Sequence, residues 1–132
     1  EGSPTATGMG NPHCTFFVED TSKINLEEMG PKFENHPLFP ERTNVQIASI
    51  SAPDKIRMRV WERGVGVTLA SGSSSCAAAV AANRRGLTGK KVQIELDGGI
   101  LNINWREDGV WMTGPTMNVF AGTFSEEFLN SL

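Results

Sequence analysis

Alternating apolar and polar residues predict a chain built mainly from strands. The segments "NVQIASIS" and "KIRMRVWE" alternate with a period of two and are joined by "APD", which predicts an antiparallel hairpin. Further along, "KVQIELDGGILNINWREDGVWMTGP" holds three alternating runs, separated by Asp97-Gly98 and Asp108-Gly109, two dipeptides that favour tight turns. Strands are also expected in "HCTFFVED" (13–20) and, as the last one, in "MNVFAGTF" (117–124).

Two segments carry a helical pattern instead. In residues 24–37, "INLEEMGPKFENHP", Leu26 and Met29 lie at helical spacing before Gly30-Pro31, which is expected to interrupt the helix. The second helix is predicted from near Ser74 to Arg85, with Gly86 as the residue that ends it.

The second helix is apolar on all sides and nearly all alanine over residues 76–82, which indicates a thin helix buried by closely packed strands. We therefore predict an α+β fold, in which a mostly antiparallel, β-barrel-like sheet wraps around a central Ala-rich helix.

Length and composition narrow the class of protein. The chain of 132 residues with 39% hydrophobic content suits one domain, expected over residues 9–132 after a linker at 1–8, "EGSPTATG". The net charge is −3, and acidic and basic residues are mixed along the chain, so no basic cluster predicts binding to nucleic acid. Without a long apolar run or a signal segment at the start, we expect no membrane contact and a cytoplasmic location. The first residue, Glu1, favours a piece of a longer protein.

The turn "LASGSSSC" before the Ala-rich helix is the main candidate for a binding site. A Gly/Ser turn that enters a helix presents unpaired N–H groups at the positive end of the helix dipole, so Gly72, Ser73 and Ser74 could donate to a carboxylate or phosphate. The alternative is that the serines only cap a buried helix.

Other chemistries fit less well. "GLTGKK" lacks the spacing of a Walker A loop, and "SGSSSC" lacks the second glycine of a serine-hydrolase elbow. A metal site would need His13, Cys14, His36 and Cys76 from scattered positions, so we predict no metal and treat both cysteines as small buried thiols without a disulfide.

Four blocks in order resemble the C-terminal half of diaminopimelate epimerase: "MGNPH" (9–13), "ENHPLFPERTNV" (34–45), "VWERGVGVTLASGSSSCAAAVAA" (60–82) and "MTGP" (112–115). The resemblance implies a homodimeric enzyme in which each chain has two similar domains and binds its substrate between them. It implies interconversion of LL- and meso-diaminopimelate on the route to lysine, without pyridoxal phosphate or another cofactor. This chain would supply one domain, and its partner would be the missing N-terminal domain.

The resemblance also implies a mechanism with two cysteines, one on each side of the α-carbon, of which one is a thiolate and the other a thiol. Ser71 stands where the cysteine of this half is expected. A free thiol titrates at about 8.5, whereas a serine hydroxyl is a far weaker acid. This half-site is therefore expected to bind substrate with little turnover.

The remaining site residues are carried over position by position from the same resemblance. His13 would lie beside the reaction centre, and Gly72 and Ser73 would donate backbone N–H groups to the reacting carboxylate. Glu62 would serve catalysis and, with Arg63, recognise the charges of the substrate. Polar ends of the substrate would be held by Asn11 and Asn44.

Two rival hypotheses remain open. The chain could be a non-catalytic domain that binds an amino acid or anion at residues 71–74. It could also associate with itself and so cover the face that a second domain would otherwise cover.

Overall fold

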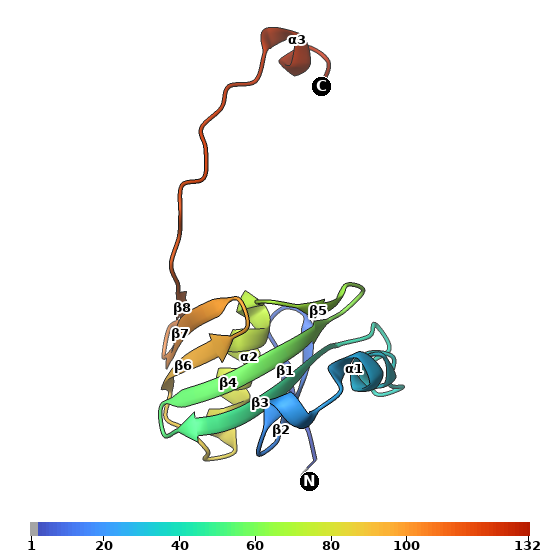
Figure 1. Cartoon of the computed structure of the whole chain (residues 1–132), viewed down its shortest axis with the longest axis vertical. Helices are drawn as coiled ribbons and strands as arrows, with labels where there is room; N and C mark the ends of the chain where they lie inside the picture. The colour runs from blue at the N-terminus through green and yellow to red at the C-terminus, as the bar shows by residue number, and fades with distance from the viewer. Residues whose placement is uncertain (1–2) are drawn as a thin grey trace.

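A single curled sheet wraps one buried helix in the computed structural model, which describes residues 3–132 (Figure 1). Neighbouring strands follow the order β1-β2-β3-β4-β6-β7-β8, and β5 pairs with the second half of β4. The bounds are β1 Thr5–Gly8, β2 Pro12–Phe17, β3 Asn44–Ala52, β4 Lys55–Glu62, β5 Gly66–Thr68, β6 Lys91–Leu96, β7 Gly99–Arg106 and β8 Gly109–Thr113. The helices are η1 Thr21–Lys23, α1 Leu26–Glu34, α2 Gly72–Arg84 and α3 Glu126–Leu129.

Most strand pairs are antiparallel, as predicted. The β3–β4 hairpin and the β6–β7–β8 meander form at the expected places, and the parallel pairs are β2 with β3 and β4 with β6. Gly99 and Gly109 both have φ values in the left-handed region, 140° and 135°, which explains why glycine follows each tight turn. The predicted α+β class, with a curled sheet around an Ala-rich helix, is confirmed.

Helix α2 supplies the centre of the core. Its alanines at 77–82 are buried together with Val80, and Ala78, Ala79 and Ala82 pack against Met58, Ile94 and Ile103 of the sheet. The helix begins two residues earlier than expected and ends as predicted: Gly86 has a φ of 71°, its N–H donates to Asn83, and the N–H of Leu87 donates to Ala82. This pair of hydrogen bonds is the Schellman ending of a helix.

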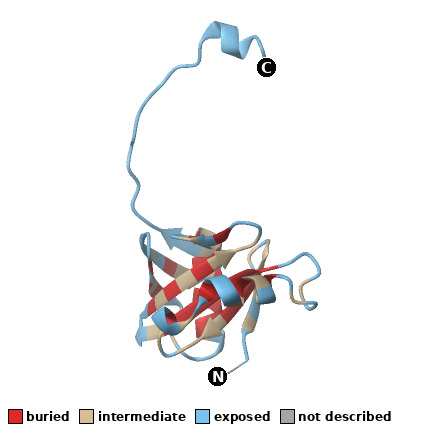
Figure 2. Ribbon diagram, turned by 45° about the vertical axis from the view of Figure 1, so that its right-hand side comes forward, coloured by how far each residue is buried: buried red, intermediate tan, exposed pale blue. Residues whose placement is uncertain are grey.

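Strands β3 and β4 are covered on both faces. Met58 on one face packs in the α2 core, whereas Trp61 on the other face contacts Gly30 of α1, and Arg59 donates to the carbonyls of Thr21 and Ile24 beside η1. The buried strip through these strands is visible in Figure 2. Because α2 lies on one face and α1 with η1 on the other, this part of the sheet has no solvent face.

Three local predictions are wrong. Residues 5–8 form β1, paired with β2, and are therefore not linker. Helix α1 continues through Pro31 to Glu34, because a helix can pass a proline when only one N–H is lost and tertiary contacts hold the turn. The strand expected at 117–124 does not form: residues 114–125 run exposed and extended away from the body toward α3 (Figures 1 and 2), and a strand requires a neighbour with which to pair.

Candidate active site

The predicted site residues gather at the N-terminal end of α2. Ser71 is the N-cap residue, with φ −154° and ψ 119°, and its side chain makes no capping hydrogen bond. Ser71 therefore does not cap the helix through its side chain. The first N–H groups of a helix have no intrahelical acceptor, so the backbone of Gly72 and Ser73 presents donors beside Ser71.

Gly72 lies against strand β8. A Cβ atom placed on Gly72 would lie 3.0 Å from Sδ of Met112 and 3.1 Å from its Cε, which is closer than ordinary van der Waals contact. Glycine at this position therefore lets the first turn of α2 pass beside Met112 while its backbone stays accessible.

A chain of hydrogen bonds leads from Ser71 to Asn11. Oγ of Ser71 donates to Oγ of Ser74 at 3.0 Å, and Nε2 of Gln46 donates to the same Ser74 oxygen at 2.9 Å. The Nε2 atom of Gln46 also lies 2.9 Å from Nδ1 of His13, and Nε2 of His13 lies 2.9 Å from Oδ1 of Asn11. We call these five residues the polar relay: Asn11, His13, Gln46, Ser71 and Ser74.

Burial and charge keep His13 neutral. Its side chain is fully buried on β2, and desolvation, followed by the positive charge of Arg63, lowers the pKa of His13 from 6.5 to about 4. At neutral pH, His13 is therefore an imidazole with one protonated nitrogen rather than a cation.

Asn44 connects two turns of the site. Its Nδ2 donates to the carbonyl of Pro12 at 3.1 Å, and its Oδ1 accepts from the backbone N–H of Arg63 at 2.9 Å. The predicted residues Asn11 and Arg63 therefore lie on turns that share one buried amide as their support.

Glu62 and Arg63 end strand β4 and enter the turn that follows it. Oε1 of Glu62 accepts from Oγ1 of Thr68 at 2.6 Å, and the guanidinium of Arg63 donates to the carbonyl of Glu41 at 2.9 Å. Arg63 is close enough to His13 to affect its pKa. Arg63 therefore lies near the polar relay, and Glu62 directly precedes it at the end of β4.

A buried carboxylate that the sequence did not reveal supports this turn. Glu34 accepts hydrogen bonds from Nε1 of Trp61, from the N–H of Gly64 and from Arg42, at 2.6, 2.8 and 2.9 Å. Burial by itself would raise the pKa of Glu34, but the hydrogen bonds from Trp61 and Gly64 and the charge of Arg42 outweigh it and lower the pKa.

Neither cysteine is prepared to act as a thiolate. Burial raises the pKa of Cys14 to about 11, and burial also raises the pKa of Cys76. Cys14 is buried, as predicted, whereas Cys76 is only partly buried and packs against the edge of the core. In residues 3–132, no group of three or more His, Cys, Asp or Glu side chains is placed to hold a metal ion.

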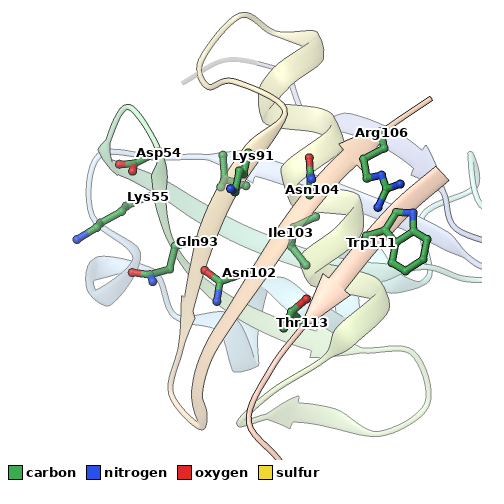
Figure 3. Close-up of a pocket in the computed structure, with 11 residues that line it drawn as sticks. Asp54, Lys55, Lys91, Gln93, Asn102, Ile103, Asn104, Arg106, Trp111 and Thr113 are labelled. Carbon is green, nitrogen blue, oxygen red and sulfur yellow. The ribbon is translucent and has the colours of Figure 1, made fainter. Parts of the chain in front are cut away.

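One groove of the surface borders the candidate site, and a second lies away from it on the outer face of the sheet. The first, of about 790 Å³, is lined by Asn11 with its neighbours Gly10 and Pro12, by residues 6–8 and by the loop at 38–42. The other, of about 540 Å³, lies on the outer face of β6–β8 beside Trp111 and Asn102, on the side away from α2 (Figure 3), and contains none of the predicted site residues. Across the described part of the chain, no helix is long and apolar enough to span a membrane.

Comparison with known proteins assigns the family. The sequence model described as diaminopimelate epimerase matches residues 5–119. The chain belongs to the diaminopimelate epimerase family. It is 58% identical over 123 residues to the diaminopimelate epimerase of Rhodospirillum centenum, covering 92% of this chain and 42% of the relative. The enzyme of the same name from Acidiphilium cryptum is 54% identical over 128 residues, or 96% of this chain and 46% of the relative.

The chain thus spans less than half the length of these two relatives.

Solved structures agree on the fold. A putative phenazine biosynthesis PhzC/PhzF protein from Clostridium difficile superposes with a TM-score of 0.64 at 18% identity, covering 97% of this chain and 48% of the other. The phenazine biosynthesis protein of the PhzF family from Bacillus anthracis gives a TM-score of 0.55 at 25% identity, covering 83% and 37%.

Proposed function

We propose that this chain is the C-terminal half of a cofactor-independent diaminopimelate epimerase, which interconverts the LL and meso forms of diaminopimelate for lysine biosynthesis. The observation that supports the proposal most is the polar relay, which joins two residues of the "GNPH" turn to Ser71 at the N-terminal end of α2. Family membership supplies the substrate and the reaction.

The reacting carboxylate would lie at the first turn of α2. Backbone N–H groups of Gly72 and Ser73 are not capped by Ser71, and the helix dipole favours a negative charge there. As the α-proton leaves, negative charge grows on this carboxylate, so donors at that point stabilise the transition state.

The charged and amide side chains would orient the rest of the substrate. Arg63 can pair with the distal carboxylate and Glu62 with an ammonium group. Asn11 and Asn44 would contact the remaining polar groups, while Asn44 also holds the backbone of Arg63 in place. The neutral imidazole of His13 would serve as a hydrogen-bonding group beside the reaction centre.

Epimerisation requires a base on one face of the α-carbon and an acid on the other. One group removes the α-proton, the electron pair stays on the carbon, and the opposite group returns a proton with inverted configuration. Ser71 occupies the position of the acid or base of this half. Because a serine hydroxyl ionises far less readily than a thiol, we expect binding with little turnover until a thiol stands at this position.

Exposed apolar side chains support the proposal that a second, N-terminal domain covers this face. Leu69, just before the turn, is 67% exposed, and Met112 beside Gly72 is 50% exposed. The extended segment after β8 also exposes apolar side chains: Met117, Val119, Phe120 and Phe124. Apolar groups exposed together in this way are typical of an interface. Two complete chains, each with an N-terminal and a C-terminal domain, would form the homodimer.

The test follows deuterium incorporation from D₂O at the α-carbon of diaminopimelate. The chain is mixed with the N-terminal domain of the Rhodospirillum centenum relative, once with Ser71 and once as Ser71→Cys. We expect exchange with the Ser71→Cys chain and at least about a hundredfold less with Ser71. Ser73→Cys, two residues further along the same turn, is the matched control and should not restore exchange.

Ser71 also favours a second candidate, a non-catalytic domain that binds an amino acid through the same turn. This function predicts saturable binding of diaminopimelate by calorimetry and no exchange in either the Ser71 or the Ser71→Cys mixture. That pair of results would contradict the epimerase proposal.

A further inference from the structure

Gln46 was not among the site residues that the sequence suggested, yet it is the centre of the polar relay. It lies on β3, is fully buried, and faces α2 in register with Thr15 of β2 and Val60 of β4. Every polar atom of its amide has a partner: Nε2 serves His13 and Ser74, and Oε1 accepts from Oγ1 of Thr15 at 3.1 Å.

The orientation of the Gln46 amide sets the direction of each hydrogen bond. The Thr15 hydroxyl donates to Oε1, and the amide nitrogen of Gln46 faces both His13 and Ser74. A neutral amide nitrogen only donates, so Nδ1 of His13 must accept. The single proton of the neutral imidazole is then on Nε2, where it donates to Oδ1 of Asn11 at 2.9 Å.

We propose that Gln46 is a positioning residue that fixes His13 in the Nε2–H tautomer and couples it, through Ser74, to the residue at position 71. One amide proton orients the imidazole and the other orients the hydroxyl that contacts Ser71. The importance of this coupling for turnover rests on the proposed function, whereas the tautomer assignment does not.

The surrounding fold keeps the amide in this orientation. The sheet face that carries His13, Thr15 and Gln46 toward the start of α2 continues as Phe17 and Ala48 toward its apolar half. Since Gln46 is enclosed between two strands and a helix, rotation of its amide would place its nitrogen against the Thr15 hydroxyl and its oxygen against His13 and Ser74. The whole relay would then have to reverse its donors and acceptors.

The tautomer can be measured on the chain alone. Long-range ¹H–¹⁵N spectra of histidine-labelled protein at pH 7 distinguish protonated from unprotonated ring nitrogens, and a His36→Gln variant assigns the signals. We expect one protonated nitrogen in His13, Nε2, and a fully unprotonated Nδ1. A protonated Nδ1, or averaged signals from two tautomers, would overturn the proposal before any substitution of Gln46.

Substitutions then test whether Gln46 causes the preference. Gln46→Glu presents only acceptors to His13, so Nδ1 should become protonated; Gln46→Leu should give averaged tautomers. Gln93 lies in a strand on the outer face of the sheet, and Gln93→Glu and Gln93→Leu should leave the spectrum unchanged. A His13 spectrum that is unchanged in folded Gln46→Leu would contradict the assignment.

Coupling to catalysis is tested in the Ser71→Cys background with the second domain present. Gln46→Leu should slow deuterium exchange about tenfold or more, while Gln93→Leu does not. Equal exchange rates in the two variants would overturn the coupling. If no variant exchanged deuterium, the proposed function would fail while the tautomer measurement would still stand.

Discussion

The hydroxyl oxygens of Ser71 and Ser74 lie 3.0 Å apart, so the residue at the candidate reaction position rests directly on a fully buried serine. Ser74 in turn accepts from Gln46. Replacement of Ser74 should therefore affect both stability and the position of residue 71.

Ser74→Ala removes the acceptor for a buried amide proton. An unsatisfied buried donor costs about 1–3 kcal/mol, so we expect the free energy of unfolding to fall by that amount in urea denaturation. The control is Ser73→Ala, since Ser73 is only partly buried and the described residues show no hydrogen bond from its side chain. If Ser73→Ala lowered the free energy of unfolding as much as Ser74→Ala, the loss would come from a general weakening of the start of the helix and not from the polar relay.

His13 should make stability depend on pH. Its folded pKa, about 4, lies below the value of 6.5 expected when it is unfolded, so the unfolded chain binds more protons between these values. Stability should thus be complete above pH 6.5 and fall as the pH drops toward 4, by up to about 1.4 kcal/mol per pH unit. Chemical denaturation across this range measures the slope.

His13→Gln should remove that slope between pH 6.5 and 4, and His36→Gln, which keeps His13, should retain it. A slope that persisted in His13→Gln would assign the pH dependence to other groups.

Glu34→Gln should destabilise the turn that carries Arg63. The single amide oxygen can accept from at most two of the three former donors, and the amide nitrogen would face the third N–H group. Hydrogen bonds to a charged group are worth about 1.5–3 kcal/mol, so a loss in this range is expected at pH 7. Glu27→Gln, on the exposed face of α1, is the matched control and should change stability little.

The sign of the Glu34 effect with pH follows from its lowered pKa. Its contribution is present above the unfolded pKa, about 4.3, and is lost as the pH falls through the lower folded value. The difference in unfolding free energy between wild type and Glu34→Gln should therefore shrink in acid. A constant difference down to pH 2 would contradict a carboxylate role.

Gly30→Ala should disturb the contact between α1 and β4. An added Cβ would overlap Cδ2 of Trp61, whose indole donates a hydrogen bond to Glu34 and cannot move freely. Overpacking of this kind costs about 1–3 kcal/mol, and tryptophan fluorescence can report the change. Gly89→Ala is the control, because no atom lies within 4 Å of the Cβ position there. Equal stability of both variants would show that the indole relocates without cost.

The sequence predicted the strands of the meander, the hairpin and the central helix because each is encoded locally. Turn dipeptides and period-two alternation lie within a few residues of one another, and the alanine run with its closing glycine marks α2. The family resemblance named the candidate site residues, and the structure joins three of them, Asn11, His13 and Ser71, in the polar relay.

The features that the sequence could not predict depend on pairing between distant segments of the chain. In "NVQI", alternation places Val45 and Ile47 in the core and Gln46 on a solvent face, but α2 covers that face, so both sides of β3 are buried. Glu34 was missed for a similar reason, since its donors come from β4 and the turn after it. The segment 117–124 has a strand pattern without a neighbouring strand in the described structure.

The alanines of α2 have a consequence for assembly. The small methyl side chains let the helix pack closely against the sheet. The contacts that form the core therefore also fix the position of the first turn of the helix. A binding surface already ordered in the free state loses little conformational entropy when its ligand or partner arrives. The helix would therefore act as a preorganised template, on which the second domain of the proposed epimerase could close without first having to shape this half of the site.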